Sequence, residues 1–244
     1  MGVEERADEL ARRLAALRER IATACDAAGR HPDEVTLLAV TKTVPASDVA
    51  LLLDLGLTGF GENRVQEAAG KVTEVAQLRP HAAPRWHLVG GLQRNKARAC
   101  VRWADLVESV DSIRLADALD AAVRRDQDAG GRRGPLPVLV QYSVDGDPAR
   151  GGVPSAGLAG LAEHVATRPG LVLTGLMSVA PLGVDPEPAF ADIAVAAARL
   201  RADHPEASVL SAGMTADLDI AIRHGSNEVR VGTALVGERR LASS

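Results

Sequence analysis

The stretch Val35-Thr36-Leu37-Leu38-Ala39-Val40-Thr41 runs directly into Lys42 and the turn Thr43-Val44-Pro45. The apolar run predicts a buried strand, and in parallel α/β proteins functional groups collect where such strands end. A lysine amine held there in a partly dry pocket becomes a nucleophile that condenses with carbonyl compounds. The alternative is an ordinary solvated lysine. Residues further along the chain decide between the two interpretations.

After His31-Pro32, short β-branched runs alternate with Ala- and Leu-rich stretches, which is typical of parallel βα units. We predict eight strands, and helical stretches follow most of them. Eight strands in 244 residues favour a (β/α)8 TIM barrel, with an open doubly wound sheet as the alternative. The predicted strands are residues 35–41, 59–61, 86–89, 106–109, 137–143, 172–177, 208–211 and 228–231, and the helices are 47–55, 62–77, 92–103, 112–128, 155–167, 186–203 and 215–223.

An extra amphipathic helix precedes the first strand. Leu10, Leu14, Leu17 and Ile21 are spaced by four, three and four residues, so they form one apolar face. Whether this face covers the lower end of the barrel or a partner is left open by the sequence. Because proline and glycine clusters stay within the connections and form no long linker, we expect one domain over residues 1–244.

The composition excludes several classes of partner. The net charge of −4 and 2% aromatic residues argue against nucleic-acid binding. Cys25 and Cys100 lack the spacing of a zinc site or a disulfide framework, so we expect two small buried hydrophobes. The chain has neither an apolar signal core nor the ~18 continuous apolar residues of a membrane span. We therefore expect no membrane partner and a cytoplasmic location.

The carboxyl ends of the predicted strands carry polar groups that suit a small polar ligand, without a metal constellation. His87 among them is interpreted as a base or as a hydrogen-bonded strand-end histidine, with the second favoured. The set comprises Lys42, Glu62, Asn63, His87, Ser109, Ser143, Met177, Ser178, Ser211, Met214, Thr215, Arg230, Gly232 and Thr233.

The last two loops have the features of a phosphate site. Residues 210–215 lead to a helix with Thr215 as its expected N-cap, and Gly232 and Thr233 follow the final strand. Glycines, hydroxyls and helix-start amides bind phosphate, and barrels place such sites after strands seven and eight. The alternative is a pair of ordinary capped turns.

Arg230 lies between two valines in the last strand, so its side chain is expected to point into the barrel. A buried guanidinium needs an acceptor. Either a ligand near the mouth or an ion pair to Glu228, Asp217 or Glu62 would supply it.

Six stretches in consistent order over nearly the whole chain resemble one family. They are residues 39–43 (AVTKT), 59–67 (GFGENRVQE), 86–90 (WHLVG) with 92–96 (LQRNK), 175–177 (GLM), 210–214 (LSAGM) and 229–233 (VRVGT). Together they resemble the pyridoxal phosphate homeostasis protein family. The resemblance implies an alanine racemase N-terminal-like barrel that binds pyridoxal 5′-phosphate (PLP) as a Schiff base on Lys42. It also implies that Arg230 faces the pyridine nitrogen, that Ser211, Gly232 and Thr233 face the phosphate, and that Asn63 and Met214 surround the cofactor.

The loop after the fifth predicted strand departs from the family pattern. Ser143, Asp147 and Arg150 stand where the family commonly has Asn, Glu and Lys, and Ala212 replaces a frequent methionine. These changes affect the roles carried over to that loop and leave the lysine and phosphate positions intact.

The resemblance also bears on catalysis. An arginine at the pyridine nitrogen leaves that nitrogen unprotonated, which weakens the cofactor as an electron sink. Racemisation in larger relatives needs a tyrosine from a second domain, whereas Tyr142, the only tyrosine here, lies within a predicted strand. We therefore expect a carrier with little or no catalysis, a monomer or weak homodimer that takes part in PLP homeostasis and supplies PLP-dependent apo-enzymes.

Two enzymatic alternatives stay open. One is a PLP-dependent amino-acid racemase or lyase that uses Lys42 as one base and His87 as another. The other is an aldolase-like barrel in which Lys42 forms a Schiff base with a sugar phosphate. Hydrogen exchange at Cα of amino acids and the colour of the cofactor-treated protein separate these alternatives from a carrier.

Overall fold

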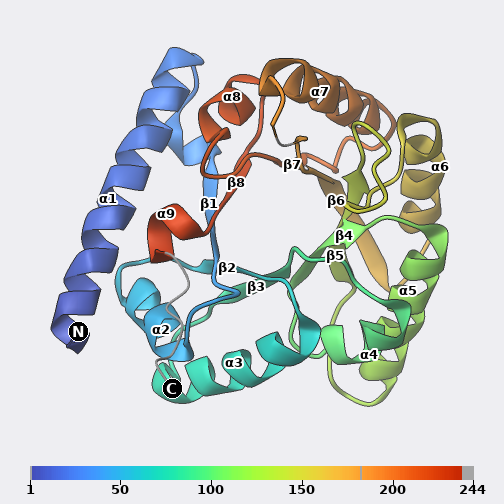
Figure 1. Ribbon diagram of the computed structural model, residues 1–244. Coiled ribbons are helices and arrows are strands. Elements are labelled where there is room, and N and C mark those ends of the chain that lie inside the picture. The colour runs from blue at the N-terminus through green and yellow to red at the C-terminus, as the bar shows by residue number, and fades with distance from the viewer. Residues whose placement is uncertain (1, 182, 238–244) are drawn as a thin grey trace.

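The computed structural model describes residues 2–181 and 183–237, which form a closed parallel barrel with the strands in sequential order (Figure 1). The (β/α)8 prediction is confirmed, and the open sheet is wrong because β1 pairs with β8. The strands are β1 (Thr36–Val40), β2 (Gly59–Glu62), β3 (Arg85–Leu88), β4 (Leu106–Val110), β5 (Leu136–Tyr142), β6 (Leu171–Ser178), β7 (Val209–Ser211) and β8 (Glu228–Val231).

Helices surround the strands on the outside of the barrel (Figure 1). Apolar side chains of strands and helices form one extensive core between these layers, and both cysteines are fully buried in it, as expected. The helices are α1 (Val3–Ala27), α2 (Ala46–Asp54), α3 (Val65–Leu78), α4 (Ala97–Cys100), α5 (Ile113–Asp128), α6 (Ser155–Ala166), α7 (Pro186–Asp203), α8 (Leu218–Arg223) and α9 (Thr233–Val236), with short 3-10 turns η1 (Pro32–Glu34) and η2 (Arg94–Lys96).

Two predicted helices are shorter in the structure. The stretch 92–103 holds only η2 and α4, because residues 101–103 form a turn in which the amides of Trp103 (3.1 Å) and Ala104 (2.9 Å) both donate to the carbonyl of Cys100. The helix expected from Thr215 begins at Leu218. The Asp217 carboxylate accepts the amide of Met214 (2.6 Å), so residues 214–217 form a turn and Thr215 is not the N-cap.

Helix α1 lies along the outer wall of the barrel, beside α2, α8 and α9 (Figure 1). Its predicted apolar face is confirmed, since Leu10, Leu14, Leu17 and Ile21 are buried. The helix after β8 has only four residues, so α1 supplies the cover that a longer final helix would give. The open question of what this helix covers is thereby answered: it covers the side of the barrel.

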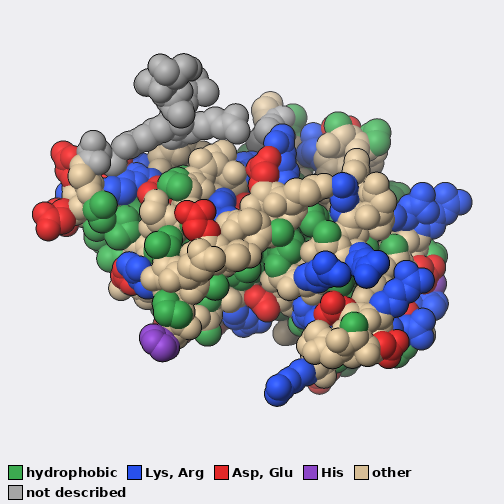
Figure 2. Space-filling model, turned by 90° about the horizontal axis from the view of Figure 1, so that it is seen from below, with side chains coloured by type: hydrophobic (Ala, Val, Ile, Leu, Met, Phe, Trp, Pro, Cys, Tyr) green, Lys and Arg blue, Asp and Glu red, His purple; other side chains and the backbone are tan. Residues whose placement is uncertain are grey.

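The surface mixes basic, acidic and apolar side chains on the face shown in Figure 2. Several of the charges are paired, as in Arg20 with Asp219 and Arg79 with Asp54. Within the described residues, no helix combines the length and the apolar character that crossing a membrane requires.

Candidate functional site

Lys42 lies in the turn directly after β1, and its side chain is exposed. It makes no hydrogen bond or ion pair with another described residue, so the expected partly dry pocket is wrong. The buried acid nearest to this turn is Glu62, at the end of β2, and Lys71 of α3 already neutralises it (Nζ to Oε1, 2.7 Å). Thr41 donates its hydroxyl to the same oxygen (2.7 Å). The Glu62 carboxylate is therefore already engaged and does not draw the Lys42 amine inward.

The loops after β1 and β8 lie next to each other. Ala39 pairs in register with Val231, and a Cβ added to Gly232 would lie 3.5 Å from the carbonyl oxygen of Val40. The loop with Gly232 and Thr233, which is one of the two predicted phosphate loops, is therefore a direct neighbour of the turn that carries Lys42. Thr233 is exposed and begins α9, where the first amides have no acceptor within the helix.

The loop after β7 is built around Gly213, whose φ of +93° favours glycine. A Cβ at this position would also lie 2.5 Å from the Cβ of Ala221 on α8. The half-buried Met214 follows, and Arg20 of α1 donates to the carbonyl of Thr215 (2.6 Å). Helix α1 thus braces the loop that the sequence assigns to phosphate binding.

Asn63 follows β2 at the same rim and is half-buried. Its backbone lies so close to the loop after β3 that a Cβ added to Gly90 would be 2.4 Å from the Asn63 carbonyl oxygen. Glycine at position 90 is therefore required for the present place of Asn63.

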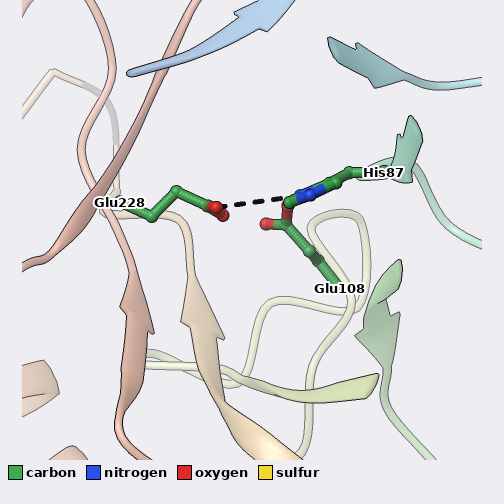
Figure 3. A group of neighbouring side chains, drawn as sticks. All are labelled: His87, Glu108 and Glu228. Carbon is green, nitrogen blue, oxygen red and sulfur yellow. Dashed lines mark hydrogen bonds and ion pairs between the residues drawn. The ribbon is translucent and has the colours of Figure 1, made fainter. Parts of the chain in front are cut away.

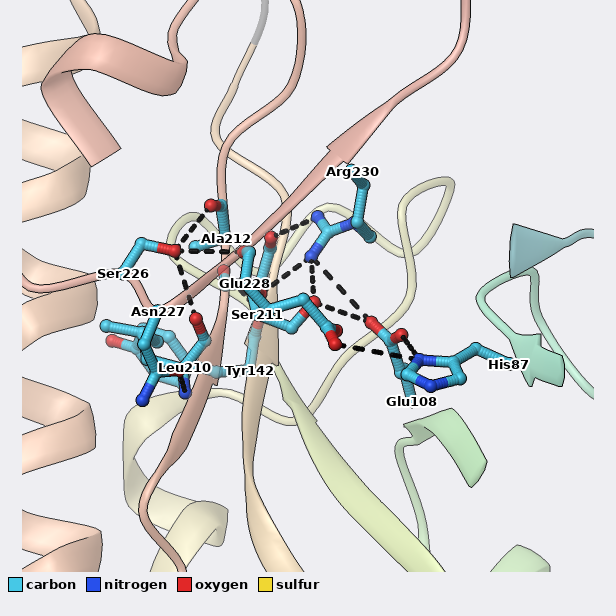
Figure 4. Close-up of polar contacts among 11 residues, drawn as sticks. His87, Glu108, Tyr142, Leu210, Ser211, Ala212, Ser226, Asn227, Glu228 and Arg230 are labelled. Atoms are coloured by element: carbon cyan, nitrogen blue, oxygen red, sulfur yellow. Dashed lines mark hydrogen bonds and ion pairs between the residues drawn. The ribbon is translucent and has the colours of Figure 1, made fainter. Parts of the chain in front are cut away.

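Arg230 points into the barrel, as predicted, and is only 5% exposed (Figure 4). Its Nη1 donates to the carbonyl (2.6 Å) and hydroxyl (2.7 Å) oxygens of Ser211, and its Nη2 donates to the carbonyl of Ser178 (2.7 Å). The acid within ion-pair distance is Glu108, at 3.9 Å.

None of the three acids expected to pair with Arg230 does so. Glu62 binds Lys71, and Asp217 accepts the amide of Met214. Glu228 lies near His87 instead, with 3.7 Å between its Oε2 and Nδ1. The actual partner was missed because Glu108 comes from β4, far away in the sequence. The sequence feature that could have indicated Glu108 is a single acid within the largely apolar run Leu106–Val110.

His87, Glu108 and Glu228 converge inside the barrel from β3, β4 and β8 (Figure 3). The Nδ1 of His87 lies 2.8 Å from Oε1 of Glu108, and Ser211 donates its hydroxyl to Oε2 of the same carboxylate (2.6 Å). His87 is therefore a hydrogen-bonded histidine, as favoured, but its ring lies inside the barrel and reaches the cavity at the amino ends of the strands instead of the mouth. The Ser211 hydroxyl is likewise engaged inside the barrel.

The charged groups of this cluster shift one another's pKa values. Burial alone would lower the pKa of His87, but the hydrogen bond to Glu108 and the two carboxylates outweigh it and raise that pKa. Burial opposes ionisation of Glu108, yet its bond to His87 and the charges of His87 and Arg230 lower its pKa. Burial, followed by the charge of Glu108, raises the pKa of Glu228 to about 7.

The loop after β5 is held by its own contacts. The Ser143 hydroxyl accepts the amide of Gly146 (3.0 Å), and Arg150 pairs with Asp145 and Asp147. The residues that depart from the family pattern therefore stabilise this loop through contacts within it.

Tyr142 faces outward from the barrel and donates its hydroxyl to Asp192 of α7 (2.6 Å). Burial and this bond raise the pKa of Tyr142 to about 12. The phenol thus points away from the rim that carries Lys42.

A cavity of about 700 Å³ opens at the amino ends of the strands, at the other end of the barrel from Lys42. Its walls combine polar and apolar side chains, and His87 and Glu228 are among the residues that reach it. Other lining residues are Leu38, Arg85, Leu106 and Val209.

Comparisons with known proteins place the chain in a family. Residues 13–240 match the family model described as alanine racemase, N-terminal domain. The pyridoxal phosphate homeostasis protein of Mycobacterium tuberculosis is 47% identical over 98% of this chain and 96% of its own length. PipY of Synechococcus elongatus, solved with PLP bound, is 34% identical over 93% of this chain and all of its own, with a TM-score of 0.79.

A more distant likeness concerns the fold alone. Alanine racemase from Corynebacterium glutamicum is 16% identical, with a TM-score of 0.65, and the match covers 98% of this chain and 62% of the racemase. The racemase therefore has substantial chain beyond the shared barrel. By the near-full-length matches above, this chain belongs to the pyridoxal phosphate homeostasis protein family.

Proposed function

We propose that this protein binds PLP as a Schiff base on Lys42 and takes part in intracellular PLP homeostasis, delivering the cofactor to apo-enzymes with little or no catalysis of its own. The observation that carries the proposal is the family membership, with 47% identity to a relative named for PLP homeostasis and 34% identity to a relative solved with PLP. The geometry of the rim adds support.

The groups at the rim fit a phosphorylated aldehyde. Lys42 offers an accessible amine, and Gly232 and Thr233 stand on the neighbouring loop, where helix-start amides and a hydroxyl suit a phosphate. When bound, PLP supplies an electron sink and an aldehyde that amines can capture. The residues proposed to hold it are Lys42, Asn63, Ser211, Met214, Arg230, Gly232 and Thr233.

Arg230 is suited to face a neutral ring nitrogen. Its guanidinium keeps its charge, and its bonds to Ser211 and Ser178 fix its position. Because the Ser211 hydroxyl is bonded to Arg230 and Glu108, we assign that side chain to positioning Arg230. Contact of residue 211 with the phosphate would then come from its backbone.

The surroundings of Lys42 favour a carrier over an enzyme. Racemisation needs a second group for proton transfer on the opposite side of the substrate. The Tyr142 hydroxyl is bound to Asp192, and His87 is bound to Glu108 inside the barrel. An exposed amine also lets an aldehyde enter and leave, which reversible storage requires.

The visible spectrum of the purified protein with added PLP tests the Schiff base. We expect an absorption band, and after borohydride reduction a covalent adduct of one PLP on the peptide that contains Lys42. Lys42→Ala should lose both signals. Lys96→Ala is the matched control, because Lys96 is another lysine outside the proposed site, and it should keep both. A colourless wild-type protein would favour the aldolase-like alternative.

Transfer of the cofactor tests the carrier role. PLP-loaded protein is mixed with a PLP-dependent apo-enzyme, and recovery of that enzyme's activity is followed beside the same amount of free PLP. Failure to release PLP would contradict the role in delivery. Rapid deuterium incorporation at Cα of amino acids that disappears in Lys42→Ala would support a racemase or lyase instead.

A further inference from the structure

The His87, Glu108 and Glu228 side chains meet in the barrel interior (Figure 3), where Glu108 borders Ser211 and Arg230 of the proposed PLP site. One nitrogen of His87 and one oxygen of each carboxylate all lie within 4.8 Å of one another. The three residues are 5%, 0% and 6% exposed, so water does not surround their charges.

Glu108 has hydrogen-bond partners in His87 and Ser211, whereas Oε1 of Glu228 has no donor among the described residues. The Nδ1 of His87 carries at most one hydrogen, and Glu108 lies closer to it (2.8 Å) than Glu228 does (3.7 Å). Among the described residues, no donor reaches Oε1 of Glu228, which is buried and without a hydrogen bond. Arg230 does not supply this donor, because its contacts are with Ser211, Ser178 and Glu108.

A single cation placed among the three side chains would satisfy them together. One imidazole nitrogen and two carboxylate oxygens form the kind of donor set that zinc and neighbouring divalent transition metals accept, and a four-coordinate ion would take a water as its fourth ligand. The cavity at the amino ends of the strands gives a path from solvent, since both His87 and Glu228 line it.

We propose that His87, Glu108 and Glu228 form a binding site for a divalent transition-metal ion of the zinc class, entered from the amino end of the barrel. The bound ion would connect β3, β4 and β8 across the interior. Because Glu108 also holds Ser211, the ion would help fix the side chains that position Arg230. The sequence did not reveal this site, since its ligands come from strands up to 141 positions apart (His87 to Glu228).

Metal binding is measured on the untagged full chain, stripped with a chelator and dialysed against Zn²⁺. We expect one Zn²⁺ per chain, a higher melting temperature with the metal, and visible absorption bands when Co²⁺ replaces it. The same stoichiometry is expected in Lys42→Ala, so the outcome does not depend on PLP binding.

Glu228→Gln keeps the shape of the side chain and removes a charged ligand. It should fold and weaken Zn²⁺ binding by about tenfold or more, as should His87→Gln. His164→Gln removes a histidine–carboxylate pair at the surface (His164 Nε2 to Asp117 Oδ1, 2.7 Å) and should leave binding unchanged. Absence of stoichiometric binding, or equal binding by wild type and Glu228→Gln, would overturn the proposal. If His87→Gln does not fold, the Zn²⁺ affinity of Glu228→Gln alone tests the proposal.

Discussion

The rim of the barrel around Lys42 and the interior around Arg230 use charged side chains in opposite ways. Lys42 is exposed and bonds to no described residue, whereas Arg230 is 5% exposed and donates three hydrogen bonds (Figure 4). A free amine can capture and release a ligand, and a guanidinium held from several sides keeps one orientation. We infer that the molecule separates capture at the rim from positioning in the interior.

The largest effect on stability is expected in the interior. Glu108→Gln removes the carboxylate that faces both His87 and Arg230, and it should lower the free energy of unfolding by about 3–5 kcal/mol, because the buried Arg230 guanidinium loses its counter-charge. Urea unfolding measures the change. Asp117→Asn, which breaks the surface pair with His164, should cost below about 1 kcal/mol. Equal costs for the two variants would contradict the contrast between interior and surface.

The next largest effect on stability is expected in the loop after β7, where the backbone requires glycine. Gly213→Ala combines a φ of +93° with a Cβ 2.5 Å from that of Ala221, so we expect a loss of about 2–3 kcal/mol. Gly130→Ala, at φ +79° with open space around the added Cβ, should cost about 1 kcal/mol and serves as the control. Comparing the thermal unfolding of both variants separates the cost of the Cβ contact from the cost of the positive φ. A Gly213→Ala variant as stable as Gly130→Ala would show that the loop moves to accommodate the added Cβ, and it would contradict the prediction.

A smaller effect on stability is expected at the outer wall of the barrel. Tyr142→Phe should lower stability by about 1 kcal/mol, since it removes the hydrogen bond to Asp192. The folded-state pKa of about 12 lies above the unfolded value of about 10, so this contribution is complete below about pH 10 and is lost as pH rises through the folded value. Tyr142 is the only tyrosine, so ultraviolet absorption reports its ionisation directly. A midpoint near 10 in the folded protein would contradict the bond.

The smallest effect on stability is expected at Lys42. Lys42→Ala should change the free energy of unfolding by less than about 0.5 kcal/mol, because the side chain is exposed and unbonded within the described chain. Lys71→Ala is the contrasting control: it leaves the buried Glu62 without its counter-charge and should cost about 3 kcal/mol. Chemical denaturation compares them. A large loss in Lys42→Ala would mean that the rim is more structural than its contacts indicate.

Local patterns predicted most of the fold. Alternating β-branched and helical stretches indicated all eight strands, and the spacing of Leu10, Leu14, Leu17 and Ile21 indicated α1. The errors fell at helix ends, where turn hydrogen bonds override the helical preference of the sequence. The turn that closes on the carbonyl of Cys100 ends α4, and the bond from the Met214 amide to Asp217 delays the start of α8.

The candidate site was predictable only in part. The alternation of Val229, Arg230 and Val231 indicated the inward arginine, because side chains alternate along a strand. Its partner Glu108 lay beyond such reasoning, and so did the exposure of Lys42. In both cases the outcome depends on which other charges the fold brings near.

By itself, the sequence determined the order and type of the elements, the place of Lys42 after the first strand, and the inward side of the last strand, because each follows from periodicity over a few residues. Only the tertiary structure decided that β8 closes onto β1, that α1 covers the outer wall, and that His87, Glu108 and Glu228 meet. Those contacts depend on closure and register among strands distant in sequence, which set the partners of each buried charge.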